Sequence, residues 1–85
     1  MGIQGIRRDY NDDSIPNAGE YGKNRIGQWY GVPPNQPELL ANLSAHTVEE
    51  NEDGTITVEP SILVTLPYLN LSWHGFLTRG IWEEI

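Results

Sequence analysis

Cysteine is absent from this chain of 85 residues. The chain therefore forms no disulfide bond, and it offers neither a thiolate metal site nor a thiol nucleophile. A chain of this length folds as a single domain with a small hydrophobic core. Because no covalent link supports that core, we expect a protein partner, a second copy of the chain or a ligand to complete it.

Basic residues are scarce. The sequence has 5 Lys and Arg against 12 Asp and Glu, for a formal net charge of −7. Residues 1–30 are neutral overall, whereas residues 31–85 contain only Arg79 against eight acidic residues. Such a surface repels phosphate, which argues against direct binding to nucleic acid or to an anionic membrane. It is suited to attract a basic protein surface instead, but the simpler interpretation, which we prefer at this point, is that the acidity keeps a small protein soluble.

Long apolar runs and catalytic motifs are missing as well. The first twenty residues have no signal-peptide pattern, and no segment is long enough to span a membrane, so we predict a cytoplasmic protein that is not secreted. There is no Gly-x-Ser-x-Gly motif, no phosphate-binding glycine loop and no His-Glu-x-x-His motif. We therefore predict no catalytic residues and a protein that is not an enzyme.

The first segment of the sequence has an unusual composition. Residues 1–38 hold six of the nine Gly and four of the six Pro, and their large apolar residues are irregularly spaced. This composition is typical of turns, so we predict an irregular arm over residues 1–38, pinned by single apolar anchors, and a small β domain over residues 39–85. Within the arm, Trp29 and Tyr30 precede two prolines. We favour packing of these rings on the prolines, with a surface platform for a ligand or peptide as the alternative.

Two β-hairpins are predicted in the second segment. Alternation from Leu43 onward, a turn at Asn51–Gly54 and the β-branched run Thr55–Glu59 indicate the first hairpin. Pairing of Glu50 with Thr55 would place Val48 opposite Thr57 and His46 opposite Glu59. Ser61–Leu66 is predicted to be a linking strand that is buried on both faces.

The second hairpin joins Leu71–Thr78 to Ile81–Ile85 through a two-residue turn at Arg79-Gly80. One face then carries Trp73, Leu77 and Trp82, and the other carries His74, Phe76, Ile81 and Ile85. Because both faces are apolar, we expect this hairpin to be central to a sandwich or covered by the arm or a partner. The predicted fold class is mainly β, a small antiparallel sheet or sandwich of two hairpins plus a linking strand, with an irregular N-terminal arm.

The two histidines occupy equivalent places in a five-residue motif that occurs twice, as Asn-Leu-Ser-Ala-His at 42–46 and as Asn-Leu-Ser-Trp-His at 70–74. If the hairpins were related by a twofold axis, His46 and His74 would converge, with Glu59 as a third ligand of the kind zinc accepts. The alternative is that each His is a half-buried strand residue with one hydrogen bond. No cofactor is predicted, with zinc as the alternative, and the candidate binding residues are Trp29, Tyr30, Trp73, Arg79 and Trp82.

The strings DGTITVEPSILV at 53–64 and WHGFLTRGIW at 73–82 resemble a family of small phage and prophage proteins of unknown function. The resemblance covers about residues 43–84 and extends to a domain of bacterial ubiquitin-like operons with a suggested metal-binding role. It implies a viral protein located in the host cytoplasm or assembled in a virion. The relatives that look metal-binding carry cysteines that this chain lacks, and only His74 matches a candidate position.

Four functions follow as hypotheses. The first is a non-catalytic phage-type binding protein that acts through protein–protein interaction, against a host or defence factor. The second is a virion structural or decoration protein that self-assembles. The third is a small metal-dependent hydrolase that uses His46, His74 and Glu59; a weaker fourth is a small-ligand binder that stacks a ring on Trp29 or Trp73 beside Arg79.

Overall fold

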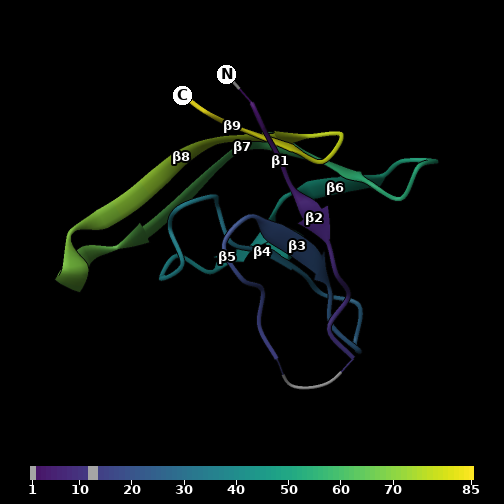
Figure 1. Ribbon diagram of the computed structural model, residues 1–85, viewed down its shortest axis with the longest axis horizontal. Helices are drawn as coiled ribbons and strands as arrows, with labels where there is room; N and C mark the ends of the chain where they lie inside the picture. The colour runs from purple at the N-terminus through teal and green to yellow at the C-terminus, as the bar shows by residue number, and fades with distance from the viewer. Residues whose placement is uncertain (1, 12–13) are drawn as a thin grey trace.

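The computed structural model describes residues 2–11 and 14–85, and it is mainly β, as predicted (Figure 1). The elements in chain order are β1 (Ile3–Gln4), β2 (Ile6–Arg7), β3 (Glu20–Lys23), β4 (Trp29–Gly31), β5 (Ala41–Asn42), the 3₁₀ helix η1 (Leu43–Ala45), β6 (Thr47–Glu50), β7 (Ile56–Leu66), the 3₁₀ helix η2 (Pro67–Leu69), β8 (Leu71–Thr78) and β9 (Ile81–Glu84). They form a five-stranded sheet in the order β1-β9-β8-β7-β6 and a four-stranded sheet in the order β2-β3-β4-β5.

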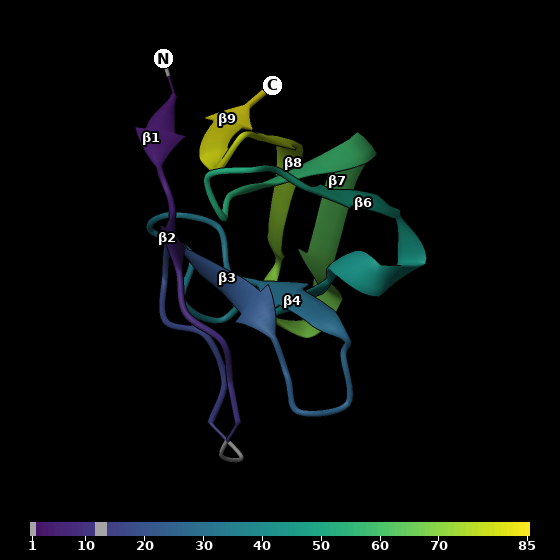
Figure 2. The ribbon, with the colours of Figure 1, turned by 90° about the vertical axis from the view of Figure 1, so that its right-hand side faces the viewer.

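The first residues of the chain connect the two sheets. β1 pairs antiparallel with β9, and β2 pairs parallel with β3 (Figure 2). Between them, the Gly5 amide donates to the Gly80 carbonyl at 2.7 Å, and the Ile6 amide donates to the Gly19 carbonyl at 3.0 Å. The segment that we expected to be an irregular arm thus contributes β1 to β4. The smaller sheet also includes β5, so it continues past residue 38.

The β8–β9 hairpin has the predicted register. Leu77 pairs with Trp82, Phe76 pairs with Glu83, and Thr78 pairs with Ile81 across a two-residue turn. Gly80 in that turn has a φ of 76°, a conformation that glycine adopts without steric cost. The alternation of apolar residues and the short turn together fix which residues face inward.

The predicted register of the β6–β7 hairpin is wrong by one residue. Glu50 pairs with Ile56, Val48 pairs with Val58, and Thr47 takes the place opposite Glu59 that we assigned to His46. The loop is one residue longer than expected because the Asn51 amide donates to the Thr55 carbonyl at 2.7 Å.

β7 is a single strand of 11 residues rather than two strands separated at Pro60. Pro60 instead lies in an irregularity of the β7–β8 pairing between Val58 and Ile62. Alternation resumes after it, with Ile62 buried and Leu63 63% exposed. The prediction that Ser61–Leu66 is buried on both faces is therefore wrong, since no element of residues 2–11 and 14–85 packs over Leu63.

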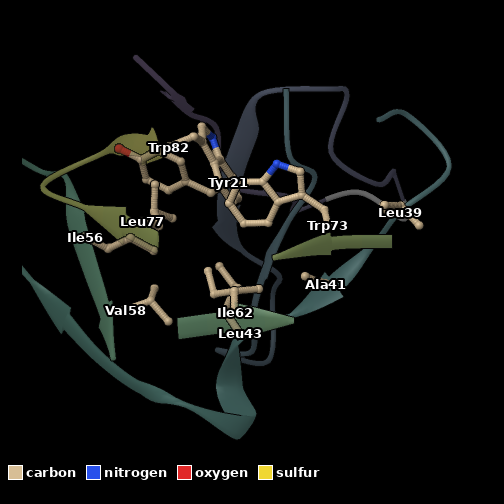
Figure 3. Close-up of a cluster of buried hydrophobic side chains, with 10 residues drawn as sticks. All are labelled: Tyr21, Leu39, Ala41, Leu43, Ile56, Val58, Ile62, Trp73, Leu77 and Trp82. Carbon is tan, nitrogen blue, oxygen red and sulfur yellow. The ribbon is translucent and has the colours of Figure 1, made fainter. Parts of the chain in front are cut away.

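The core lies between the two sheets (Figure 3). Its buried side chains are Tyr21, Leu39, Ala41, Leu43, Ile56, Val58, Ile62, Trp73, Leu77 and Trp82. The rings of Trp73 and Trp82 meet edge to face, with centroids 5.5 Å apart and planes at 87°. The Trp82 indole N–H donates to the Gly19 carbonyl at 3.1 Å, which satisfies a polar group that burial would otherwise leave unpaired.

Candidate functional site

The three predicted metal ligands are not brought together. His46 follows η1 as its C-terminal cap, with its amide donating to the Leu43 carbonyl. Glu59 pairs with Thr47, and His74 lies on β8, where its Nε2 is 3.0 Å from the Ser61 hydroxyl oxygen. Within residues 2–11 and 14–85, no cluster of three His, Asp or Glu side chains is placed to hold a metal ion.

The repeated five-residue motif does not correspond to a structural repeat. Asn42 caps η1, and its side-chain oxygen accepts from the Ser44 amide at 3.0 Å. Asn70, in contrast, is left-handed with a φ of 54° and leads directly into β8. The short 3₁₀ turn after Asn42 displaces His46 from the strand that we expected, so no twofold relation brings the histidines together.

The candidate binding residues separate into core and surface. Trp73 and Trp82 are only 3% and 1% exposed, so they form the core rather than a ligand platform. Tyr30 is half-buried. Arg79 is exposed in the β8–β9 turn, where its guanidinium is 3.6 Å from the Asp53 carboxylate.

Trp29 is covered by cations. The Arg7 guanidinium carbon lies 5.0 Å from its ring centroid and the Lys23 ammonium lies 5.3 Å from it, which are cation–π distances. Arg7 also donates to the carboxylates of Asp9 and Glu50, at 3.1 and 2.6 Å. The hydrogen bond from Arg7 is the largest cause that holds the pKa of both carboxyl groups below their usual values. This cluster therefore joins β2 to the β6–β7 hairpin and leaves little of the Trp29 ring for a ligand.

The outer face of the five-stranded sheet is not covered by another sheet in the described part of the chain. Residues of β6 to β9 alternate, so the neighbours of each core residue point away from the smaller sheet. Leu63 pairs with His74, and the Ile85 amide donates to the His74 carbonyl at 2.9 Å, which aligns these three residues across three strands. The paired residues Phe76 and Glu83 occupy the next row.

Four large apolar side chains on this outer face are in contact with solvent. Leu63 is 63% exposed, Phe76 42%, Ile81 38% and Ile85 70%. The sequence predicted the second hairpin's division into two faces, and both the inward and the outward set are confirmed. The structure shows that neither the arm nor another described element covers the outward set.

The charges on the outer face are all acidic. Glu49 and Glu59 point outward from β6 and β7, because their neighbours Val48 and Val58 point inward, and Glu83 points outward from β9. The outward positions of β6 to β9 contain no Lys or Arg. This face therefore has an apolar centre that is surrounded by acidic residues.

A separate groove of about 440 Å³ lies among the loops that flank the smaller sheet. It is lined by Tyr10, Ser14, Ile15, Pro16, Asn24, Arg25, Ile26, Tyr30 and Leu40. Tyr10 is 2% exposed, and its hydroxyl has no hydrogen-bond partner among the described residues. Burial is the main cause that raises the pKa of Tyr10 to about 12.

Sequence reasoning missed Leu63 on the outer face and Ile15, Ile26 and Leu40 at the groove. Alternation within Ser61–Leu66 is hidden because almost every residue there is apolar or β-branched. The groove residues lie in loops without a period, so only Tyr30 had a local signal.

No family model, curated protein or solved structure matches the chain. The phage relation therefore stays a prediction. The described residues also contain no helix with the length and apolar character needed to cross a membrane.

Proposed function

We propose that this protein is a non-catalytic binding protein that docks a basic protein surface on the outer face of its five-stranded sheet. One observation carries the proposal: Leu63, Phe76, Ile81 and Ile85 are exposed together on a face that no described element covers. Contiguous exposed apolar residues of this kind mark interaction surfaces in soluble proteins.

The charges support a basic partner. Glu49, Glu59 and Glu83 surround the apolar side chains, and the remainder of residues 31–85 is also strongly acidic. Complementary charge at the rim of an interface accelerates association and suppresses partners of the wrong sign. The resemblance to phage proteins favours a host protein or a defence component as this partner.

The test begins by immobilising the protein and capturing other proteins on it. Any protein that is retained is then identified and purified. That protein is then titrated against the parent chain, Phe76→Asp and Ile26→Asp. Phe76 and Ile26 are 42% and 73% exposed, so neither variant is expected to lose the fold. Phe76 lies on the outer face, whereas Ile26 lines the groove and serves as the matched control.

We expect one retained protein with a basic surface, at least tenfold weaker binding to Phe76→Asp and unchanged binding to Ile26→Asp. Binding should also weaken as salt rises, because the rim charges are exposed. A partner that binds Phe76→Asp as tightly as the parent chain, an acidic partner, or no specific partner would each contradict the proposal.

A further inference from the structure

β7 has an uncovered edge as well as an uncovered face. β6 pairs with β7 only between Ile56 and Glu59, so the sheet has no strand on that side of β7 from Ser61 to Leu66. Along these six residues, all backbone hydrogen bonds to other described residues go to β8. In Figure 1 the ends of β7 and β8 extend beyond the neighbouring strands. The edge therefore presents unpaired N–H and C=O groups in an extended conformation, ready to pair with another strand.

The residues of this edge offer no protection against pairing. Ser61-Ile62-Leu63-Val64-Thr65-Leu66 contains no charged residue and no proline, and Pro60 and Pro67 bracket it. β6, which lies along the first part of the same side of β7, carries Glu49 and Glu50. Charged residues and prolines are what soluble proteins use to block edge pairing, so the β6 part of this side of the sheet is protected and the Ser61–Leu66 part is not.

We propose that the Ser61–Leu66 edge pairs with the same edge of a second copy of this chain. An antiparallel pairing about a twofold axis perpendicular to the sheet makes one continuous sheet of ten strands. We place Leu63 opposite Leu63 of the second copy, because it is the most exposed apolar side chain of the edge. Ser61 then meets Thr65 on the outer face, and Ile62 meets Val64 on the inner face. Residues of matching character therefore pair on both faces.

The charges permit this arrangement despite the acidic surface. The nearest acidic residue of β7 is Glu59, four residues before Leu63. In the pairing centred on Leu63, the two copies of Glu59 are eight residues apart along the strand direction, roughly 26 Å at the usual rise. That separation exceeds the Debye length at physiological salt, about 8 Å, so like-charge repulsion is largely screened. A second copy fits this edge without a basic partner, and the inference does not depend on the proposed function.

The first test is the molecular mass in solution, measured by sedimentation from low micromolar to millimolar concentration. We expect the parent chain to approach the mass of two chains as concentration rises. Leu63→Lys places two like charges opposite each other at the centre of the pairing, and we expect it to keep the mass of one chain. Ile26→Lys is the control, because Ile26 is similarly exposed at the groove, and it should still form the two-chain species.

The second test uses the absence of cysteine from the chain. Residues directly opposite each other in an antiparallel pair have Cα atoms about 4.5–5.5 Å apart, within the range of a disulfide bond. Leu63→Cys should therefore form a covalent two-chain product after mild oxidation. Thr65→Cys is an exposed residue of the same edge, but its copy lies four residues away, roughly 13 Å along the strand, and should not cross-link.

Three results would overturn the proposal. They are a single-chain mass for the parent protein at all concentrations, a two-chain mass for folded Leu63→Lys, and cross-linking of Thr65→Cys in preference to Leu63→Cys. Circular dichroism of each variant establishes that it is folded before its mass is interpreted.

Discussion

The Arg7 side chain contacts four other residues in the described structure. It donates to Asp9, to Glu50 and, at 2.9 Å, to the Gly54 carbonyl, and it lies over the Trp29 ring. These partners come from both sheets, so a single guanidinium fixes the smaller sheet against the β6–β7 hairpin. Only 22% of its side chain is exposed, so its contacts are better shielded from solvent than those of a fully exposed pair.

We predict that Arg7→Gln lowers the free energy of unfolding by about 1–2 kcal/mol at neutral pH, because several hydrogen bonds to charged groups are lost. Urea unfolding followed by tryptophan fluorescence measures the change. Arg79→Gln is the control: its ion pair with Asp53 is long and exposed at both ends, so we expect a loss below about 0.5 kcal/mol. Equal losses for the two variants would contradict this account.

Acid should destabilise the protein through the same cluster. Asp9, Glu50 and Glu20 have folded-state pKa values below their ordinary values. The main cause is a hydrogen bond from Arg7 for Asp9 and Glu50, and a hydrogen bond from the Asn17 amide for Glu20. Lowered pKa values mean that the stabilisation is complete above the unfolded-state values, near pH 4, and is lost as pH falls through the folded-state values. We expect the urea midpoint to fall between about pH 5 and pH 3, and to fall less in Arg7→Gln. The same decline in both proteins would contradict the prediction.

At high pH, we expect Tyr10 to cause a loss of stability. Its pKa is raised to about 12, so the folded state holds its proton while the unfolded state releases it from about pH 10. Stability that is present below pH 10 should therefore be lost as pH rises toward 12. Tyr10→Phe removes a buried hydroxyl that has no partner among the described residues, so we expect unchanged or higher stability at pH 7 and a smaller alkaline loss. A decrease of more than about 1 kcal/mol at pH 7 would contradict the assignment of this hydroxyl as unpaired.

At the scale of elements, β8 shows how a single glycine sets the packing of a hairpin. A Cβ atom added at Gly75 would overlap the Glu83 carbonyl oxygen on β9 and would lie 2.6 Å from the Trp73 ring. The position of the Trp73 ring against Trp82 therefore depends on the missing side chain at Gly75, two residues from Trp73 on the same strand.

We predict that Gly75→Ala destabilises the protein by about 1–3 kcal/mol, the usual cost of overpacking a core. Thermal or urea unfolding provides the measurement. Ser72→Ala, on the exposed face of the same strand, should change stability by less than about 0.5 kcal/mol. If Gly75→Ala were as stable as Ser72→Ala, the close packing around Trp73 would be wrong.

The same hairpin shows what a sequence can predict. Its two-residue turn and its regular alternation fix the register of Leu77 and Trp82 from local chemistry alone. The β6–β7 register was missed because it depends on a hydrogen bond from Asn51 to Thr55 and on a capping turn at Asn42, which alternation does not reveal. β1 and β2 have two residues each, too short for any period.

The candidate site was predictable only in part. Phe76, Ile81 and Ile85 were assigned to one face from the sequence, but their exposure depends on whether another layer covers them. That is a property of the whole fold, decided by how residues 1–38 are placed. Trp73 and Trp82 looked like binding residues because aromatic residues serve both cores and interfaces, and local sequence does not separate the two roles.

For the whole molecule, the two sheets depend on each other. Tyr21 of β3 is buried in the shared core, the Trp82 indole binds the Gly19 carbonyl, and a Cβ built at Gly31 would lie 3.0 Å from the Trp82 ring. The core of the larger sheet is therefore closed by residues that precede the expected boundary at residue 38.

We predict that a fragment of residues 39–85 does not unfold cooperatively, because removal of the first 38 residues exposes the Trp82 side of the core. Urea titration with tryptophan fluorescence should give a sloping, non-sigmoidal curve for the fragment and a single sigmoidal transition for the full chain. A cooperative transition of the fragment would show that the larger sheet is an independent unit.

The measurement that tests the central claim most directly is a map of backbone amide NMR shifts while the identified partner is added to the full chain. If the outer sheet face is the docking surface, the largest shifts will lie on β7, β8 and β9, around Leu63, Phe76 and Ile85, with smaller changes at Glu59 and Glu83. Shifts that gather instead around Tyr10, Ile26 and Tyr30 would place the partner in the groove and would contradict the account.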